Sequence, residues 1–419
     1  MKLLNKLNTQ FNRNIFYNSF GSIAYCAFQY LITIAIMRIK GAEYTGIYTL
    51  SFSFTNIFAM IASFGMGHYQ LSDVEKKHSD GTFIAARFCT SIAAFLIFLI
   101  TLPFTSFSRD IMVCSAILML YRILESISSV YTCVLQKSYY YKTICLSNTL
   151  KGILPFLLLC AALYFFNLYA AVLAMCAAYM LVFIFIDFNR AVNLEGFNPK
   201  VIKHDIPKLF PPSFMLVAGG LVTSLMLFFP RYIIEKIYTI EELGYFSSIT
   251  LVMYIFNFLA GPALSVFLPE ISIFCAEKKY AVIKRMAFRM TFLAIFITIL
   301  ITLSSFIWGD FALRLVFGEK ILSYNYLLPP TLLTSGFSFI CNILAIMLVA
   351  MQNRIQYLIS LIISTLTIIL ICPVLVRHFY MNGAIYSFTI AYFECGLILL
   401  GMLLYDLKIK SASTDNKKG

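Results

Sequence analysis

The stretch Gly41–Leu50, GAEYTGIYTL, opens a long apolar segment, and the stretch Glu241–Phe246, EELGYF, opens a second one. In both stretches a glutamate is followed three residues later by glycine and five residues later by an aromatic residue. The copies begin at Glu43 and Glu241, at the same place in each half of the 419-residue chain. Duplicated helix bundles recur in membrane transporters, with the substrate path between the halves. The repeat therefore predicts two related bundles. The dipole of the helix that follows favours each glutamate, so neither needs a transport role.

The composition indicates a membrane protein. Hydrophobic residues make up 61% of the chain and charged residues only 12%, and the mean hydropathy is +0.86. A soluble domain carries about 25% charged residues. The apolar runs reach the roughly 20 residues that a helix needs to cross a bilayer, and they are continuous, whereas membrane β-strands alternate in polarity. The first run, Ile15–Met37, is too long for a signal peptide. We predict an all-α polytopic membrane protein.

Twelve spans are predicted, and they form two pseudo-symmetric six-helix bundles around a central cavity. The spans cover residues 15–37, 44–67, 83–103, 110–132, 144–166, 168–187, 211–230, 243–268, 287–308, 326–350, 356–376 and 383–405. The longest polar connection, between the sixth and seventh spans, contains Pro199 and Pro207. It divides the chain into an N-terminal bundle (1–198), a C-terminal bundle (199–410) and a disordered cytoplasmic tail (411–419).

The distribution of Lys and Arg predicts the orientation. If the N-terminus is cytoplasmic, 22 of the 32 basic residues fall in cytoplasmic segments and 8 in outer segments. Cytoplasmic loops of membrane proteins are enriched in Lys and Arg. We therefore expect both termini in the cytoplasm. The same rule explains the net charge of +13 without a nucleic-acid partner.

Several kinds of chemistry have no signature in the sequence. The eleven cysteines form no CxxC pair and no Cys/His cluster, so we interpret them as small buried hydrophobic residues. A Walker loop, an HExxH motif, a dinucleotide-binding glycine pattern and a GxSxG elbow are all absent. We predict no catalytic residue, no metal, no cofactor and no ATP hydrolysis by this chain.

Ionisable groups within the spans are the candidates for function, because a charge at the centre of a membrane helix is costly. Arg122 and Glu125 are three residues apart on one helix face. They either neutralise each other at a helix contact or line a cavity. Lys151 either extends to the cytoplasmic surface or adds positive charge to that cavity. We hypothesise that Arg122 and Lys151 line a net positive cavity.

Further candidates lie at the span ends and in the last span. Arg87 and Arg354 are either cavity residues or ordinary cytoplasmic basic residues, and Arg38 and Arg231 are either an outer gate or phosphate contacts. Glu394 lies midway along the twelfth span without a local partner. Burial raises the proton affinity of a carboxylate, so Glu394, with Glu125, is the candidate for ion coupling.

The sequence also resembles a known family over essentially its whole length. Gly41–Leu50 resembles the first-loop signature of the polysaccharide transporters in the multidrug/oligosaccharidyl-lipid/polysaccharide exporter superfamily. Gly261–Ser272 (GPALSVFLPEIS) looks like that family's segment ending the eighth helix, and Val316–Leu322 (VFGEKIL) is similar to the loop before its tenth. Asn342–Asn353 fits the segment that follows.

The resemblance is greatest to the O-antigen flippases of the Wzx type. It implies transfer of an undecaprenyl-pyrophosphate-linked oligosaccharide from the cytoplasmic to the periplasmic leaflet of the bacterial inner membrane by alternating access. It also implies a cationic cavity for the pyrophosphate and an ion gradient or membrane potential as the driving force. The implied partners are membrane lipids and the polymerase and chain-length proteins of the same pathway.

Two alternatives remain open from the residues. A drug or cation exporter of the same superfamily would need an acidic cavity, for which Glu125, Glu394 and Asp187 are the available carboxylates. A polytopic O-antigen polymerase would need a sizeable outer loop with catalytic residues. The longest outer loops predicted here, 231–242 and 309–325, are short.

Overall fold

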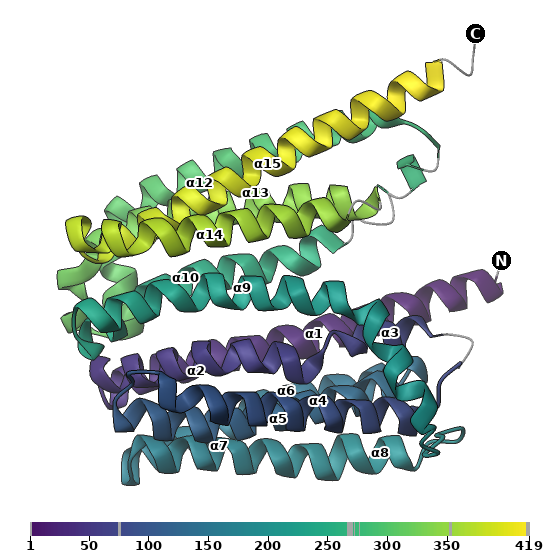
Figure 1. The fold of residues 1–419 in the computed structure, drawn as a ribbon, viewed down its shortest axis with the longest axis horizontal. Helices are drawn as coiled ribbons and strands as arrows, with labels where there is room; N and C mark the ends of the chain where they lie inside the picture. The colour runs from purple at the N-terminus through teal and green to yellow at the C-terminus, as the bar shows by residue number, and fades with distance from the viewer. Residues whose placement is uncertain are drawn as a thin grey trace. The chain divides into compact units, whose positions relative to one another are not determined.

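The computed structural model of the chain describes residues 2–73, 77–265, 271, 273–275, 277–351 and 354–415, with side chains from residue 13 onward except 254–265, 354 and 409–415. The described chain is helical and contains no strand (Figure 1). Eleven helical segments of this part are long and apolar enough to cross a membrane. The prediction of an all-α polytopic membrane protein is confirmed.

The chain divides into two compact units, Met1–Ser224 and Leu225–Gly419. The elements up to the first part of α9 belong to the N-terminal unit. They are α1 (Lys2–Ile39), α2 (Ala42–Ser63), α3 (Met66–Ser72), α4 (Asp80–Thr101), η1 (Leu102–Phe104), α5 (Arg109–Lys137), α6 (Tyr141–Phe165), α7 (Leu168–Val182), η2 (Phe183–Phe188), α8 (Asn189–Val192), η3 (Lys203–Leu209) and α9 (Phe210–Ile237).

The C-terminal unit contains the rest of α9 and the elements after it. They are α10 (Ile240–Ser265), α12 (Tyr280–Phe317), η4 (Glu319–Leu327), α13 (Leu328–Ala350), α14 (Arg354–Phe379) and α15 (Met381–Asp415). The backbone of α15 continues into the segment predicted as a tail, and residues 416–419 lie outside the described part of the chain.

Part of the helix packing of the N-terminal unit recurs in the C-terminal unit. In the N-terminal unit α2 packs on α5, α4 on α5, α5 on α7 and α6 on α7. When α2, α4, α5, α6 and α7 are matched in order with α10, α12, α13, α14 and α15, the same four pairings recur in the C-terminal unit. This internal correspondence supports the predicted duplication.

The described part of each predicted span is mainly helical, and residues 266–268 of the eighth span lie outside the described residues. The repeated glutamate pattern lies at the start of a helix in both units. Gly41 precedes α2 with φ 95°, a conformation that favours glycine. At α10 the cap is a reciprocal pair, in which the Thr239 backbone N–H donates to Glu242 Oε2 (3.0 Å) and the Glu242 N–H donates to Thr239 Oγ1 (3.2 Å). The expected helix-end role of a glutamate is thus filled at α10 by Glu242, whereas Glu241 Oε1 accepts from Tyr245 (3.4 Å).

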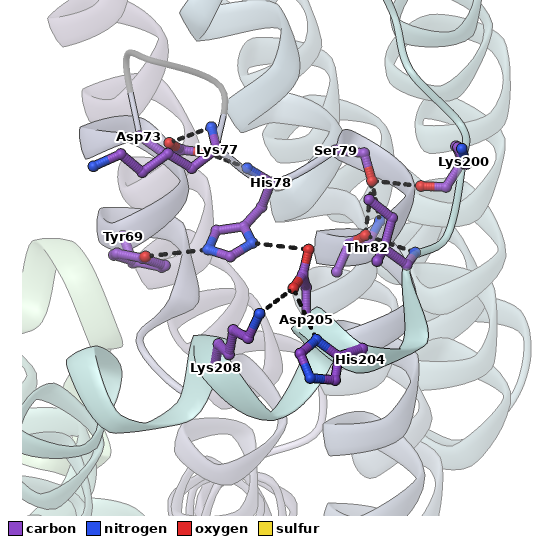
Figure 2. Close-up of polar contacts among 11 residues, drawn as sticks. Tyr69, Asp73, Lys77, His78, Ser79, Thr82, Lys200, His204, Asp205 and Lys208 are labelled. Carbon is purple, nitrogen blue, oxygen red and sulfur yellow. Dashed lines mark hydrogen bonds and ion pairs between the residues drawn. The ribbon is translucent and has the colours of Figure 1, made fainter.

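The polar connection before α9 is bonded to the start of α4 (Figure 2). The Gly81 N–H donates to Asn198 O (2.9 Å), the Ile202 N–H donates to Thr82 Oγ1 (3.1 Å) and Ser79 Oγ donates to Lys200 O. These bonds hold residues 198–202 on the N-terminal unit. The two units divide after Ser224, inside α9, which is C-terminal to the junction predicted at 198/199.

Next to these bonds, three basic side chains lie close to the carboxylate of Asp205 (Figure 2). Lys208 Nζ lies 2.7 Å from Asp205 Oδ1, His78 Nδ1 lies 3.8 Å from Oδ2, and His204 Nδ1 lies 3.6 Å from Oδ1. Because His78 comes from the segment between α3 and α4, these contacts add a second attachment of η3 to the N-terminal unit.

Candidate functional site

A cavity of about 400 Å³ lies within the N-terminal unit. Its walls come from α1, α2, α5, α6 and α7. The lining residues are Tyr25, Asn56, Ala59, Met60, Ser63, Arg122, Glu125, Ser126, Ser128, Ser129, Thr132, Cys133, Asn148, Lys151 and Tyr179. Both basic residues predicted within the spans, Arg122 and Lys151, are among them.

One polar cluster of the cavity is built on α5. Arg122 Nη1 lies 2.6 Å from Glu125 Oε2, as the spacing of three residues predicts. The guanidinium also lies 4.0 Å from the ring centroid of Phe52 on α2. The other carboxylate oxygen, Glu125 Oε1, accepts from the Tyr25 hydroxyl of α1. The two readings of this pair are therefore both realised, because Arg122 and Glu125 neutralise each other and also line the cavity.

A second polar cluster joins three elements. Lys151 on α6 forms an ion pair with Asp187 and donates to Ser128 Oγ of α5 (2.6 Å), and Ser128 in turn donates to Asp187 Oδ2 (3.0 Å). The side chain of Lys151 is 3% exposed and that of Asp187 is 0% exposed, so Lys151 does not reach the surface. Asp187 lies in the π-helical turn η2, an irregularity that changes the face to which later residues point.

The charges of the two clusters balance. Arg122 has Glu125 as its carboxylate partner, and Lys151 has Asp187. The charges of this cavity within the N-terminal unit therefore cancel, because the second carboxylate comes from another helix and lies behind the wall. The net positive cavity expected between the two halves stays a prediction. Neutral polar groups make up most of the remaining lining, with hydroxyls or amides on Tyr25, Asn56, Ser126, Ser128, Ser129, Thr132, Asn148 and Tyr179.

Arg87 is buried and bonds to the end of a neighbouring helix. It is 1% exposed, and its Nη1 donates to the carbonyl of Ser63 at the C-terminal end of α2. The neighbouring carbonyl of Ala62 accepts from Thr90 Oγ1 (2.8 Å). Two side chains of α4 thus satisfy the last carbonyls of α2. Arg87 is not among the described cavity-lining residues, and it bonds to one of them, Ser63.

The other predicted residues lie elsewhere. Arg38 is exposed at the end of α1, and Arg231 is buried on α9, where its Nη1 donates to Leu227 O (3.0 Å). The side chain of Arg354 lies outside the described residues. Glu394 is partly buried on α15, and its Oε2 is buried without a hydrogen-bond partner in the described part of the chain. Within the N-terminal unit the structure thus brings together Arg122, Glu125 and Lys151, and it leaves Arg38 and Arg87 outside the cavity lining.

Sequence reasoning missed several wall residues. The sequence places Asp187 at the cytoplasmic end of a span, and only the π-helical turn brings it to Lys151. Tyr25, Asn56 and Asn148 are polar groups inside apolar runs, which is a signal that could have identified them. Among the described residues no group of three or more His, Cys, Asp or Glu is placed to hold a metal ion.

Comparisons with known proteins agree with this architecture. The family model described as polysaccharide biosynthesis protein matches residues 11–275. The capsular polysaccharide biosynthesis protein CapF of Staphylococcus aureus is 25% identical over 390 residues, which cover 91% of this chain and 96% of CapF.

Two solved structures show the same fold. A multidrug resistance MATE family transporter of the MOP superfamily, in an inward-facing conformation, superposes with a TM-score of 0.75 at 14% identity, covering 94% of this chain and 99% of the other. The lipid II flippase MurJ, in an inward closed conformation, superposes with a TM-score of 0.72 at 14% identity, covering 94% of this chain and 89% of the other.

Proposed function

Because the chain belongs to the polysaccharide biosynthesis protein family, we propose that it is a membrane transporter that moves a lipid-linked saccharide across the bilayer. The substrate is a repeat unit of a cell-surface polysaccharide, O-antigen or capsule, linked to undecaprenyl pyrophosphate. It passes from the cytoplasmic to the outer leaflet of the bacterial cell membrane by alternating access of the two units. The polar head group moves through the protein while the lipid chain stays in the bilayer.

The cavity of the N-terminal unit is the observation that carries this proposal. Hydroxyls, amides and the charged groups of two ion pairs interrupt its otherwise mainly apolar lining, inside a bundle whose outer surface is apolar. Polar groups inside a membrane bundle are costly and mark substrate or ion pathways. A saccharide head group offers many hydroxyls and cannot enter the hydrocarbon region unaided, so a cavity of this chemistry supplies the partners it needs.

The candidate residues divide into three roles in this proposal. Arg122 and Lys151 belong to the head-group cavity, and Arg87 supports its wall. Arg38, Arg231 and Arg354 contact phosphate on either side of the membrane. Glu125 and Glu394 couple transport to an ion gradient. No soluble cofactor enters the scheme, and the other partners are membrane lipids and the polymerase and chain-length proteins that receive the translocated unit.

Deletion of the protein from its host tests the proposal. We expect lipid-linked single repeat units to accumulate on the cytoplasmic side of the membrane, measured by extracting the lipid fraction and probing its accessibility in intact spheroplasts. Translocated but unpolymerised units would instead identify a polymerase.

A drug or cation exporter is the second candidate, favoured by one observation. The carboxylate of Glu125 lines the cavity, where it could attract a cationic solute. In that case deletion would leave the lipid-linked saccharides unchanged and raise the sensitivity of the strain to cationic compounds.

A further inference from the structure

We propose that the cavity of the N-terminal unit binds the uncharged saccharide part of the substrate and excludes its phosphates. This inference rests on the proposed transport of a lipid-linked saccharide and specifies which part of that molecule the cavity holds. It differs from the expectation of a cationic cavity that binds pyrophosphate.

The cations of the cavity are already engaged. Arg122 Nη1 lies 2.6 Å from Glu125, and Lys151 is paired with Asp187, whose side chain is fully buried. A phosphate that took these cations would leave the Glu125 and Asp187 carboxylates without their positively charged partners in a region of low dielectric, beside a further negative charge. A neutral ligand leaves both pairs intact.

The rest of the described lining is uncharged. The hydroxyls of Ser129 and Thr132 donate to the carbonyls of Ser126 and Ser128, and the Asn56 amide donates to Ser224 Oγ. The oxygens of these three side chains can accept from the hydroxyls of a sugar, whereas a fully ionised phosphate has no proton to donate to them. Tyr25 and Tyr179 add ring surfaces that can pack against the apolar face of a sugar ring. The volume of about 400 Å³ is in the range of about 300–1,000 Å³ usual for small-molecule sites.

Binding to the purified full-length protein in lipid nanodiscs tests the inference. One probe is the phosphate-free saccharide released by mild acid from the lipid fraction that accumulates in the deletion strain. The other probe is inorganic pyrophosphate. Calorimetry on the wild-type protein should show that the saccharide binds and that pyrophosphate does not displace it. Displacement by pyrophosphate would overturn the inference.

Two substitutions of opposite charge sharpen the test. Arg122→Gln and Glu125→Gln should each weaken saccharide binding by about tenfold, because each breaks the same buried pair. Neither should create pyrophosphate binding. If the cavity were a phosphate site, Glu125→Gln would strengthen pyrophosphate binding and Arg122→Gln would weaken it, and that pattern would refute the inference.

Arg190→Gln and Glu195→Gln are the matched controls, because both residues are exposed and outside the cavity, and the charge changes are the same. Size-exclusion profiles establish which variants fold. If the variants do not fold, the competition between saccharide and pyrophosphate on the wild-type protein still tests the inference. Failure of the deletion strain to accumulate lipid-linked saccharide refutes the proposed function and this inference together. Accumulation of a saccharide that does not bind refutes this inference alone.

Discussion

The two ion pairs of the cavity differ in how their partners are related in the chain. Arg122 and Glu125 are one helical turn apart, so their contact follows from helix geometry. Lys151 and Asp187 come from α6 and η2, and their contact requires both the packing of α6 on α7 and the π-helical turn. The second pair therefore depends on tertiary structure in a way that the first does not.

Removal of one member of the Lys151–Asp187 pair should destabilise the protein strongly. Breaking a buried ion pair on one side costs about 3–5 kcal/mol, because the other charge stays buried, whereas replacing both by apolar residues costs far less. We expect Lys151→Met and Asp187→Leu each to lower the unfolding free energy by about this amount, and the double variant to lower it by less than either. Denaturant unfolding in detergent micelles measures the cycle, and additive losses would contradict the pairing.

Substitution of Glu394 should impair transport more than folding. Its Oε2 is buried with no hydrogen-bond partner in the described part of the chain. The amide of a glutamine at this position cannot exchange a proton as a carboxylate can. We expect Glu394→Gln to fail to restore surface polysaccharide to a strain that lacks the protein. Glu319→Gln is the control, because Glu319 is 81% exposed on η4. Full restoration by Glu394→Gln would remove this residue from the coupling scheme.

At the scale of elements, the start of α4 decides where the connection between the halves is held. Gly81 leaves room for the chain at Pro199, and a Cβ at Gly81 would overlap the Pro199 carbonyl oxygen. The bonds to Asn198 and Ile202 depend on this close approach. Composition identifies residues 188–210 as a polar connection, but it cannot show that α4 binds this connection.

Gly81→Ala should loosen this attachment. Overpacking against backbone costs typically about 1–3 kcal/mol, and we expect a loss of thermal stability in that range together with faster proteolysis between residues 193 and 203. Gly401→Ala is a matched control, because a Cβ at Gly401 meets no atom within 4 Å. That variant should be neutral or more stable by about 0.5–1 kcal/mol. Equal behaviour of the two variants would show that the close approach is unimportant.

At the scale of the molecule, four helix pairings of the N-terminal unit recur in the C-terminal unit. The repeated glutamate pattern marks α2 and α10 as equivalent helices. The match of residues 11–275 to the family model shows that the chain belongs to the polysaccharide biosynthesis protein family. Orientation in the membrane follows from the Lys and Arg distribution and stays a prediction.

Reporter fusions test that orientation. A fluorescent protein fused after Lys408 should fold and fluoresce in the cytoplasm, because the last segment is on the Lys- and Arg-rich side. Alkaline phosphatase fused after Glu319, in a predicted outer loop, should be active. The reverse result for both fusions would place the termini outside.

The sequence by itself determined the helical class of the protein, the described parts of the predicted spans and the Arg122–Glu125 contact. Each of these depends on residues close together in the chain, because a membrane helix satisfies its own backbone and must match the bilayer thickness. The tertiary structure alone decided the partner of Lys151, the neutral charge of the cavity and the attachment of the connection to α4. These depend on how each helix is rotated against its neighbours, which side-chain packing sets and no local pattern encodes.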